Sequence, residues 1–190
     1  MPLCANVCFY LQAGIRGAVF MLATIISTYI CGRMIAKAGD RQKLAMDKLK
    51  DIMSKEQKKA YKAKTKRVQK LWMTGCLLFN FGILAVLKYT NFFIGFTSLK
   101  PVDFILPMGI SFYTFQSMGY IIDVYRGVAE AEKNIFRFAL FVSFFPQLMQ
   151  GPISRWKDLK ETLFCPHTFS WAQFEMGLQR VLWGYFKKMV

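Results

Sequence analysis

The sequence predicts an all-α fold, that of a multi-pass helical membrane protein, and its composition and charge distribution lead to this prediction. Of the 190 residues, 54% are hydrophobic and 16% are aromatic, while the formal net charge is +15. The charge is concentrated in a few places, and the uncharged runs between them are long enough to cross the roughly 30 Å of a bilayer's hydrocarbon core. Hydrocarbon offers no partner for unpaired backbone amides, so we expect these runs to be helices.

Four uncharged runs are predicted to be membrane segments, and both ends of the chain add incomplete ones. The runs are residues 17–32, which is marginal in length, 71–87, 104–122 and 138–154. Pro146 and Pro152 interrupt the last run, so we expect a tilted, kinked or re-entrant element there. Residues 1–15 are apolar but short, and residues 176–190 begin an amphipathic segment. We expect one partial membrane domain, 1–190, with about four to five membrane segments, from the N-terminal part of a longer protein.

Residues 33–70 form a strongly basic segment that sets the predicted orientation. They hold 14 Lys and Arg against 4 Asp and Glu, a net of +10. Short basic loops beside membrane segments stay in the cytoplasm, so we expect this loop to be cytoplasmic and the chain to lie in the plasma membrane. A capping-box pattern, Ser54-Lys-Glu-Gln57, predicts a basic cytoplasmic helix that rests on anionic headgroups. Residues 89–101 then lie at the outer face, and residues 123–137 return to the cytoplasm.

The basic segment and the five cysteines suggest two further kinds of site, and the sequence disfavours both. Only Tyr61 and Trp72 are placed to stack on bases, and no pattern of a nucleic-acid-binding domain is present, so no nucleic-acid partner is expected. Cys4 and Cys8 lie one helical turn apart, but no His, Asp or Glu accompanies them, so no metal site is expected. The odd number of cysteines favours small buried side chains over a disulfide framework.

Polar side chains inside or beside the apolar runs are the candidate functional residues. Because amides at membrane depth are costly, we expect Gln116, Gln147 and Gln150 to face the interior of the helix bundle, where they form hydrogen bonds or line a cavity. Asp123 and Arg126 are three residues apart on one helical face. This spacing predicts a structural salt bridge at the helix end or a pair at the cytoplasmic mouth of the cavity.

Several motifs carry a resemblance to a known family. They are Leu106-Pro-Met-Gly-Ile-Ser-Phe-Tyr-Thr-Phe-Gln116, Asp123-Val-Tyr-Arg-Gly127, Phe144-Phe-Pro-Gln147 and Gly151-Pro-Ile-Ser-Arg155. With these motifs the chain resembles the membrane-bound O-acyltransferase family, and within it the bacterial branch of alginate O-acetylation and D-alanyl transfer. The resemblance covers nearly all of the chain except the basic loop. It implies a ring of tilted helices around a tunnel, of which this chain would form one wall.

The resemblance also implies an enzyme, an O-acyltransferase. It would take an acetyl or D-alanyl group from a thioester donor, acyl-CoA or an acyl carrier protein, that is reached from the cytoplasm, and it would hold no bound cofactor. The acceptor would be a hydroxyl of a cell-surface polysaccharide or cell-wall polymer, with an extracytoplasmic acyltransferase as a possible partner. The glutamines, Asp123 and Arg126 become candidates for tunnel or donor contacts. Arg155 either anchors at the headgroups or meets an anionic donor.

The family's catalytic residue is a histidine in an apolar membrane segment, where general-base catalysis is expected. The one histidine of this chain, His167, lies in a polar turn before a helix start at Ser170, so this role is not transferred to it. The catalytic histidine is expected beyond Val190, and we expect no catalytic residue in this chain, which would be inactive alone. The alternative is a non-enzymatic membrane protein, either a transporter fragment or an inactive acyltransferase remnant that acts as an assembly partner.

Overall fold

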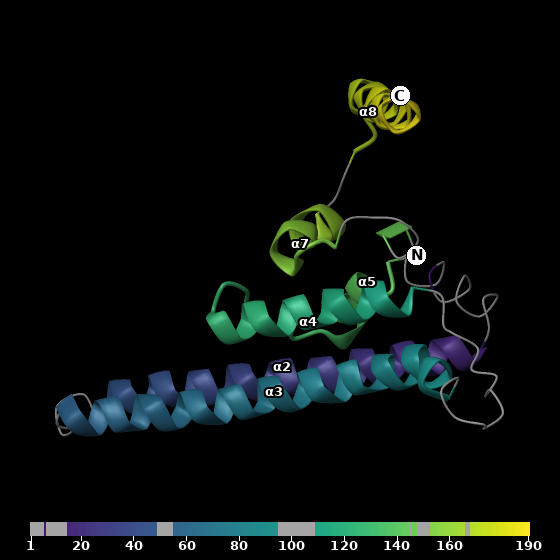
Figure 1. Cartoon of the computed structure of the whole chain (residues 1–190). Helices are drawn as coiled ribbons and strands as arrows, with labels where there is room; N and C mark the ends of the chain where they lie inside the picture. Colours follow the sequence, from purple (N-terminus) through teal and green to yellow (C-terminus); the bar gives the residue numbers. More distant parts are fainter. Residues whose placement is uncertain are drawn as a thin grey trace. The chain divides into compact units, whose positions relative to one another are not determined.

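The structure is a computed structural model whose regular elements are helices (Figure 1). The residues it describes are 6, 15–48, 55–94, 109–144, 146–147, 153–165 and 168–190. No strand occurs among these residues, so the all-α prediction is confirmed for them. The chain divides into two compact units, Met1–Lys160 and Glu161–Val190, and the candidate site lies in the first.

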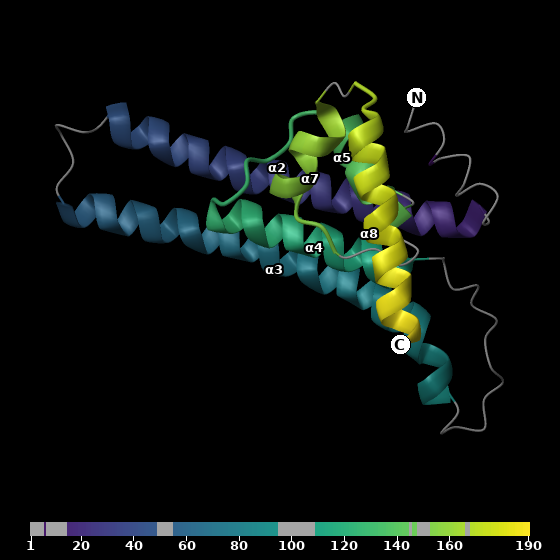
Figure 2. The ribbon, with the colours of Figure 1, turned by 90° about the horizontal axis from the view of Figure 1, so that it is seen from above.

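Two long helices form an antiparallel hairpin in the first unit. Helix α2 covers Ile15–Lys48 and helix α3 covers Lys55–Ile94, and the two lie side by side in both views (Figures 1 and 2). At 1.5 Å per residue, their 34 and 40 residues extend about 51 and 60 Å, against the roughly 30 Å of a hydrocarbon core. Both helices are long and apolar enough to cross a membrane, over Gly17–Lys48 and Lys55–Thr90.

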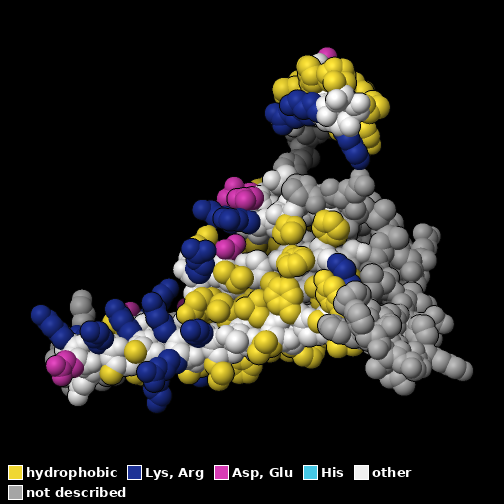
Figure 3. Space-filling model, viewed as in Figure 1, with side chains coloured by type: hydrophobic (Ala, Val, Ile, Leu, Met, Phe, Trp, Pro, Cys, Tyr) yellow, Lys and Arg dark blue, Asp and Glu magenta, His cyan; other side chains and the backbone are white. Residues whose placement is uncertain are grey.

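The basic segment differs from its prediction in one respect. It is not a separate helix. Its residues up to Lys48 belong to α2, and its residues from Lys55 onward belong to α3. Few residues in this segment stop a helix, so helical structure runs on past the apolar stretch into the charged one. Figure 3 shows the Lys and Arg side chains gathered over the end of the hairpin where α2 ends and α3 begins. Ser54, the first residue of the capping-box pattern, lies outside the described residues, so the capping box stays a prediction.

Helix α4 covers Ile110–Arg126, which places it later in the chain than the predicted segment 104–122. Gly109 precedes it with φ 74° and Gly127 follows it with φ 75°, a left-handed conformation that glycine adopts without the steric cost of a Cβ. The helix has 17 residues and therefore extends about 26 Å, slightly less than a hydrocarbon core. Residues 104–108 lie outside the described part of the chain.

Helix α4 packs against both members of the hairpin and points back toward its basic end (Figures 1 and 2). Helix α4 contacts α2 at Gly32, where an added Cβ would lie 3.2 Å from Cε1 of Tyr120. Small residues allow helix backbones to approach in this way. The loop after α4 is tied to α2 by Tyr29, whose hydroxyl donates to the Lys133 carbonyl at 2.6 Å. It is tied to α4 by Tyr120, whose hydroxyl accepts from the Glu132 amide at 2.9 Å.

The predicted segment 138–154 is not one continuous helix. Helix α5 covers only Ile135–Val142 and ends before Ser143. Its 8 residues extend about 12 Å, so it cannot cross a bilayer, which agrees with the prediction of an interrupted element. Asn134 starts this helix, because its side-chain oxygen accepts from the Phe136 amide at 2.9 Å.

Two further helices follow. Helix α7 covers Trp156–Phe164 and helix α8 covers Trp171–Met189, and no side chain of α8 is buried. Among the described residues, two helices are both long and apolar enough to cross a membrane. The count of four to five membrane segments stays a prediction, because residues 95–108 and 148–152 lie outside the described part of the chain.

Candidate functional site

Aromatic side chains from α4, α5 and the start of α7 form the buried centre of the first unit. The ring centroids of Tyr120 and Phe138 are 4.7 Å apart, and those of Phe141 and Trp156 are 5.0 Å apart in an edge-to-face arrangement. Trp156 is only 2% exposed and also meets the Tyr120 ring. Such ring pairs add stability beyond their buried area, so this cluster fixes α5 and the start of α7 against α4.

Gln116 lies beside this cluster, on α4, and its side chain is 4% exposed. Its Nε2 donates to the Phe141 carbonyl at 3.1 Å and to Oε1 of Gln147 at 3.4 Å. The last carbonyls of any helix lack partners within the helix, and in apolar surroundings an unpaired carbonyl is costly. The Gln116 amide satisfies one such carbonyl at the end of α5, so it acts as a cap provided by a neighbouring helix.

Gln147 extends this connection to the segment before α7. Its Nε2 donates to Oγ of Ser154 at 2.7 Å, and its own backbone amide donates to the Phe144 carbonyl at 3.1 Å. Gln116, Gln147 and Ser154 thus form a hydrogen-bonded string, which we call the amide string. Its members are amides and a hydroxyl, which hold neighbouring backbone in place and do not exchange protons readily near neutral pH.

The other predicted site residues lie apart from the amide string. Arg155 is exposed beside buried Trp156, and Gln150 lies outside the described residues, as does His167. Asp123 and Arg126 form no ion pair with each other in the part of the chain that the structure describes, in contrast to the predicted salt bridge. The Asp123 carbonyl instead accepts the Val128 amide at 2.9 Å and closes the end of α4, while Arg126 is exposed at a small cavity.

A second polar contact joins the hairpin helices within their apolar stretch, at a residue that is not among the predicted site residues. Asn80 is 1% exposed, and its Nδ2 donates to Oγ of Ser27 at 3.2 Å and to the Cys76 carbonyl at 2.9 Å. The polar Asn80 inside the uncharged and largely apolar run 71–87 was the available signal, because polar residues in such runs commonly hydrogen-bond across helices.

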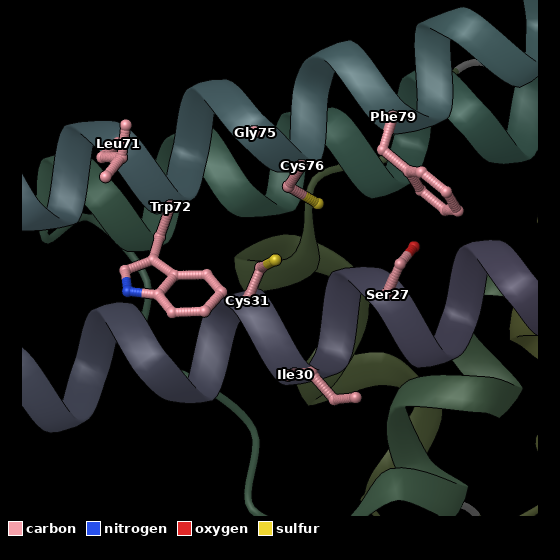
Figure 4. Close-up of a pocket in the computed structure, with 8 residues that line it drawn as sticks. All are labelled: Ser27, Ile30, Cys31, Leu71, Trp72, Gly75, Cys76 and Phe79. Atoms are coloured by element: carbon pink, nitrogen blue, oxygen red, sulfur yellow. The ribbon is translucent and has the colours of Figure 1, made fainter.

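An apolar groove of about 400 Å³ runs between α2 and α3 near this contact. Figure 4 shows the thiols of Cys31 and Cys76 facing each other across it, with Trp72 and Phe79 on either side. The groove offers hydrophobic contact and little polarity. Within the described residues no group of three or more His, Cys, Asp or Glu side chains is placed to hold a metal ion.

The residues of the amide string belong to the motifs that end at Gln116, Gln147 and Arg155. Comparison with curated proteins confirms the resemblance to the membrane-bound O-acyltransferase family, through its alginate O-acetylation branch.

Three relatives show the extent of the match. The chain is 39% identical over 136 residues to the probable alginate O-acetylase of Pseudomonas syringae pv. tomato, covering 66% of this chain and 26% of the relative. It is 38% identical over 135 residues to the probable alginate O-acetylase of Pseudomonas aeruginosa, covering 65% and 25%. It is 27% identical over 164 residues to the peptidoglycan O-acetyltransferase of Helicobacter pylori, covering 70% and 31%. The chain thus spans about a quarter to a third of the length of these relatives. No family model and no solved structure matches it.

Proposed function

We propose that the chain is part of a plasma-membrane O-acetyltransferase that modifies hydroxyl groups of a cell-surface polysaccharide. The observation that carries this proposal is the identity of 38–39% to alginate O-acetylases over about two thirds of the chain. A third relative is named a peptidoglycan O-acetyltransferase, so its name also specifies the transfer of an acetyl group. These relatives favour acetyl over D-alanyl as the transferred group, and a polysaccharide as the acceptor.

The proposed reaction is acyl transfer from a thioester donor, acyl-CoA or an acyl carrier protein. The acceptor hydroxyl oxygen forms a bond to the thioester carbonyl carbon while a base takes the hydroxyl proton. The carbon–sulfur bond then breaks, and the departing thiolate receives that proton and leaves as the thiol. This chain's described residues contribute positioning. The aromatic cluster around Trp156 excludes water, and the amide string holds the C-terminal end of α5 in place as part of the tunnel wall.

The proposed topology places the basic end of the hairpin in the cytoplasm. Its support is the excess of Lys and Arg in residues 33–70, which keeps short loops on the cytoplasmic side. Helix α4 points toward the same end (Figure 1), so Arg126 and the loop after it would lie on the cytoplasmic side as well. A thioester donor from the cytoplasm would approach the protein at this end.

The experiment is an in-frame deletion of the coding region, followed by measurement of ester-linked acetate and D-alanine on the purified cell-surface polysaccharides by NMR. We expect ester-linked acetate to be lost and to return when the coding region is resupplied. Loss of ester-linked D-alanine with acetate unchanged would overturn the choice of acetyl group. Unchanged levels of both esters would overturn the proposed function and favour the transporter fragment.

A further inference from the structure

A cavity of about 320 Å³ lies where the basic part of α3 meets the C-terminal end of α4. Its lining residues are Lys66, Gln69, Tyr125 and Arg126. Two of the four are cations, the other two are neutral hydrogen-bonding groups, and no carboxylate is among them. The volume falls in the range of small-molecule sites in proteins, and the lining is that of an anion site.

The two cations at this cavity are available to a ligand. Lys66 and Arg126 are both exposed, and within the described residues neither forms a hydrogen bond or an ion pair. They come from helices far apart in the sequence and share one cavity without a counter-ion. Like charges held close together repel, so an anion bound between them is favoured by both.

Gln69 fixes one wall of the cavity. Its Nε2 donates to the Ile35 carbonyl on α2 at 3.0 Å, which ties the side chain to the facing helix of the hairpin. The same amide packs against Gly39, where an added Cβ would lie 3.2 Å away. The wall is therefore held in position before any ligand arrives, and a preformed site loses less conformational entropy on binding.

We propose that this cavity binds a phosphate group, with the Arg126 guanidinium as a two-pronged donor and the Lys66 ammonium as a point charge. Guanidinium groups match the geometry of phosphate oxygens, and lysine adds charge without a fixed direction. The net charge of +10 in residues 33–70 raises the local concentration of anions around the site. The phosphate can come from a soluble phosphate ester or from the headgroup of an anionic phospholipid. Phosphate binding at this cavity does not depend on the acetyl-transfer reaction.

The test measures binding of pyrophosphate to the full chain in nanodiscs of phosphatidylcholine by isothermal titration calorimetry. Lys66→Ala and Arg126→Ala are each expected to weaken binding about tenfold, the loss of one charge-assisted contact. The matched control is Lys59→Ala, which removes the same charge from an exposed position of the same helix outside the cavity. It should weaken binding by less than about twofold. Lys66→Arg keeps the charge and should retain most of the affinity. Arg126→Lys keeps the charge but loses the two-pronged contact, so it should weaken binding by more than Lys66→Arg and by less than Arg126→Ala.

A second arm separates the two sources of phosphate. In nanodiscs that contain phosphatidylglycerol, a headgroup in the cavity would lower the affinity for pyrophosphate, and native mass spectrometry would show fewer retained lipids for Lys66→Ala than for Lys59→Ala. Unchanged pyrophosphate affinity in these nanodiscs would assign the site to a soluble phosphate ester. Failure of both probes to bind, or equal weakening by Lys59→Ala, would overturn the proposal, because diffuse surface charge would then explain any binding.

Discussion

At the scale of single residues, the amide of Gln116 determines how helix α5 can end inside an apolar unit. A helix end leaves carbonyls without partners, and Gln116 supplies a donor to the Phe141 carbonyl at 3.1 Å. The same nitrogen contacts Gln147, so the side chain couples the end of α5 to the segment before α7. Gln116 is therefore important because its side-chain amide pairs with a backbone carbonyl at the end of α5.

Replacing Gln116 with Leu should destabilise the protein by about 1–3 kcal/mol, because the similar-sized apolar side chain leaves a buried carbonyl unpaired. Thermal unfolding in detergent, followed by circular dichroism, measures the effect. Gln179→Leu is the matched control, since it makes the same change at an exposed position of α8 and should have little effect. Equal stability of the two variants would show that the Gln116 hydrogen bonds do not hold the fold.

Sequence reasoning identified Gln116 and Gln147 as inward-facing residues because amides at membrane depth are costly. It did not identify their shared partner, since the end of α5 becomes visible only when the helices are packed. The expected salt bridge between Asp123 and Arg126, in contrast, does not form among the described residues. A spacing of three residues makes contact possible, but Arg126 is the last residue of α4 and lines a cavity with Lys66 instead.

At the scale of elements, the sequence predicted the helices but not where they end. Uncharged runs mark the part of a helix that suits hydrocarbon, and α2 and α3 continue well beyond those runs into charged sequence. Gly109 precedes α4 in a left-handed conformation, and Gln116 donates to a carbonyl at the end of α5, and hydropathy detects neither feature. Where each helix begins and ends therefore depends on the local backbone conformation and on packing against other helices.

The end of α4 gives a test at this scale. Gly127 has φ 75°, and its amide donates to the Val124 carbonyl at 3.1 Å, so Gly127→Ala should destabilise the protein by about 1 kcal/mol. Gly119→Ala on the same helix should be neutral or stabilising, because an added Cβ there meets nothing within 4 Å and alanine favours helix. Chemical unfolding of both variants measures the difference. A stabilising Gly127→Ala would contradict the left-handed turn.

At the scale of the whole molecule, the first unit contains the α2–α3 hairpin, whose helices are long enough to cross a membrane, and α4, which packs against both of them. It also contains the short helix α5, whose end is capped by Gln116 of α4. The apolar surface of the hairpin and its basic end favour a membrane protein oriented by positive charge (Figure 3). The relatives are named for O-acetyl transfer, and this chemistry is the one proposed for the protein of which the chain is part.

The most direct measurement is the acetylation of alginate by a chimeric enzyme. The stretch of the Pseudomonas aeruginosa alginate O-acetylase that matches this chain is replaced by the corresponding residues of this chain, and ester-linked acetate on secreted alginate is measured by NMR. Immunoblots of membrane fractions confirm equal amounts of chimera and parent. If the chain is an equivalent part of an O-acetyltransferase, the chimera should acetylate alginate to a substantial fraction of the parent's level. A chimera that reaches the membrane in normal amounts and leaves alginate without acetyl esters would contradict this account.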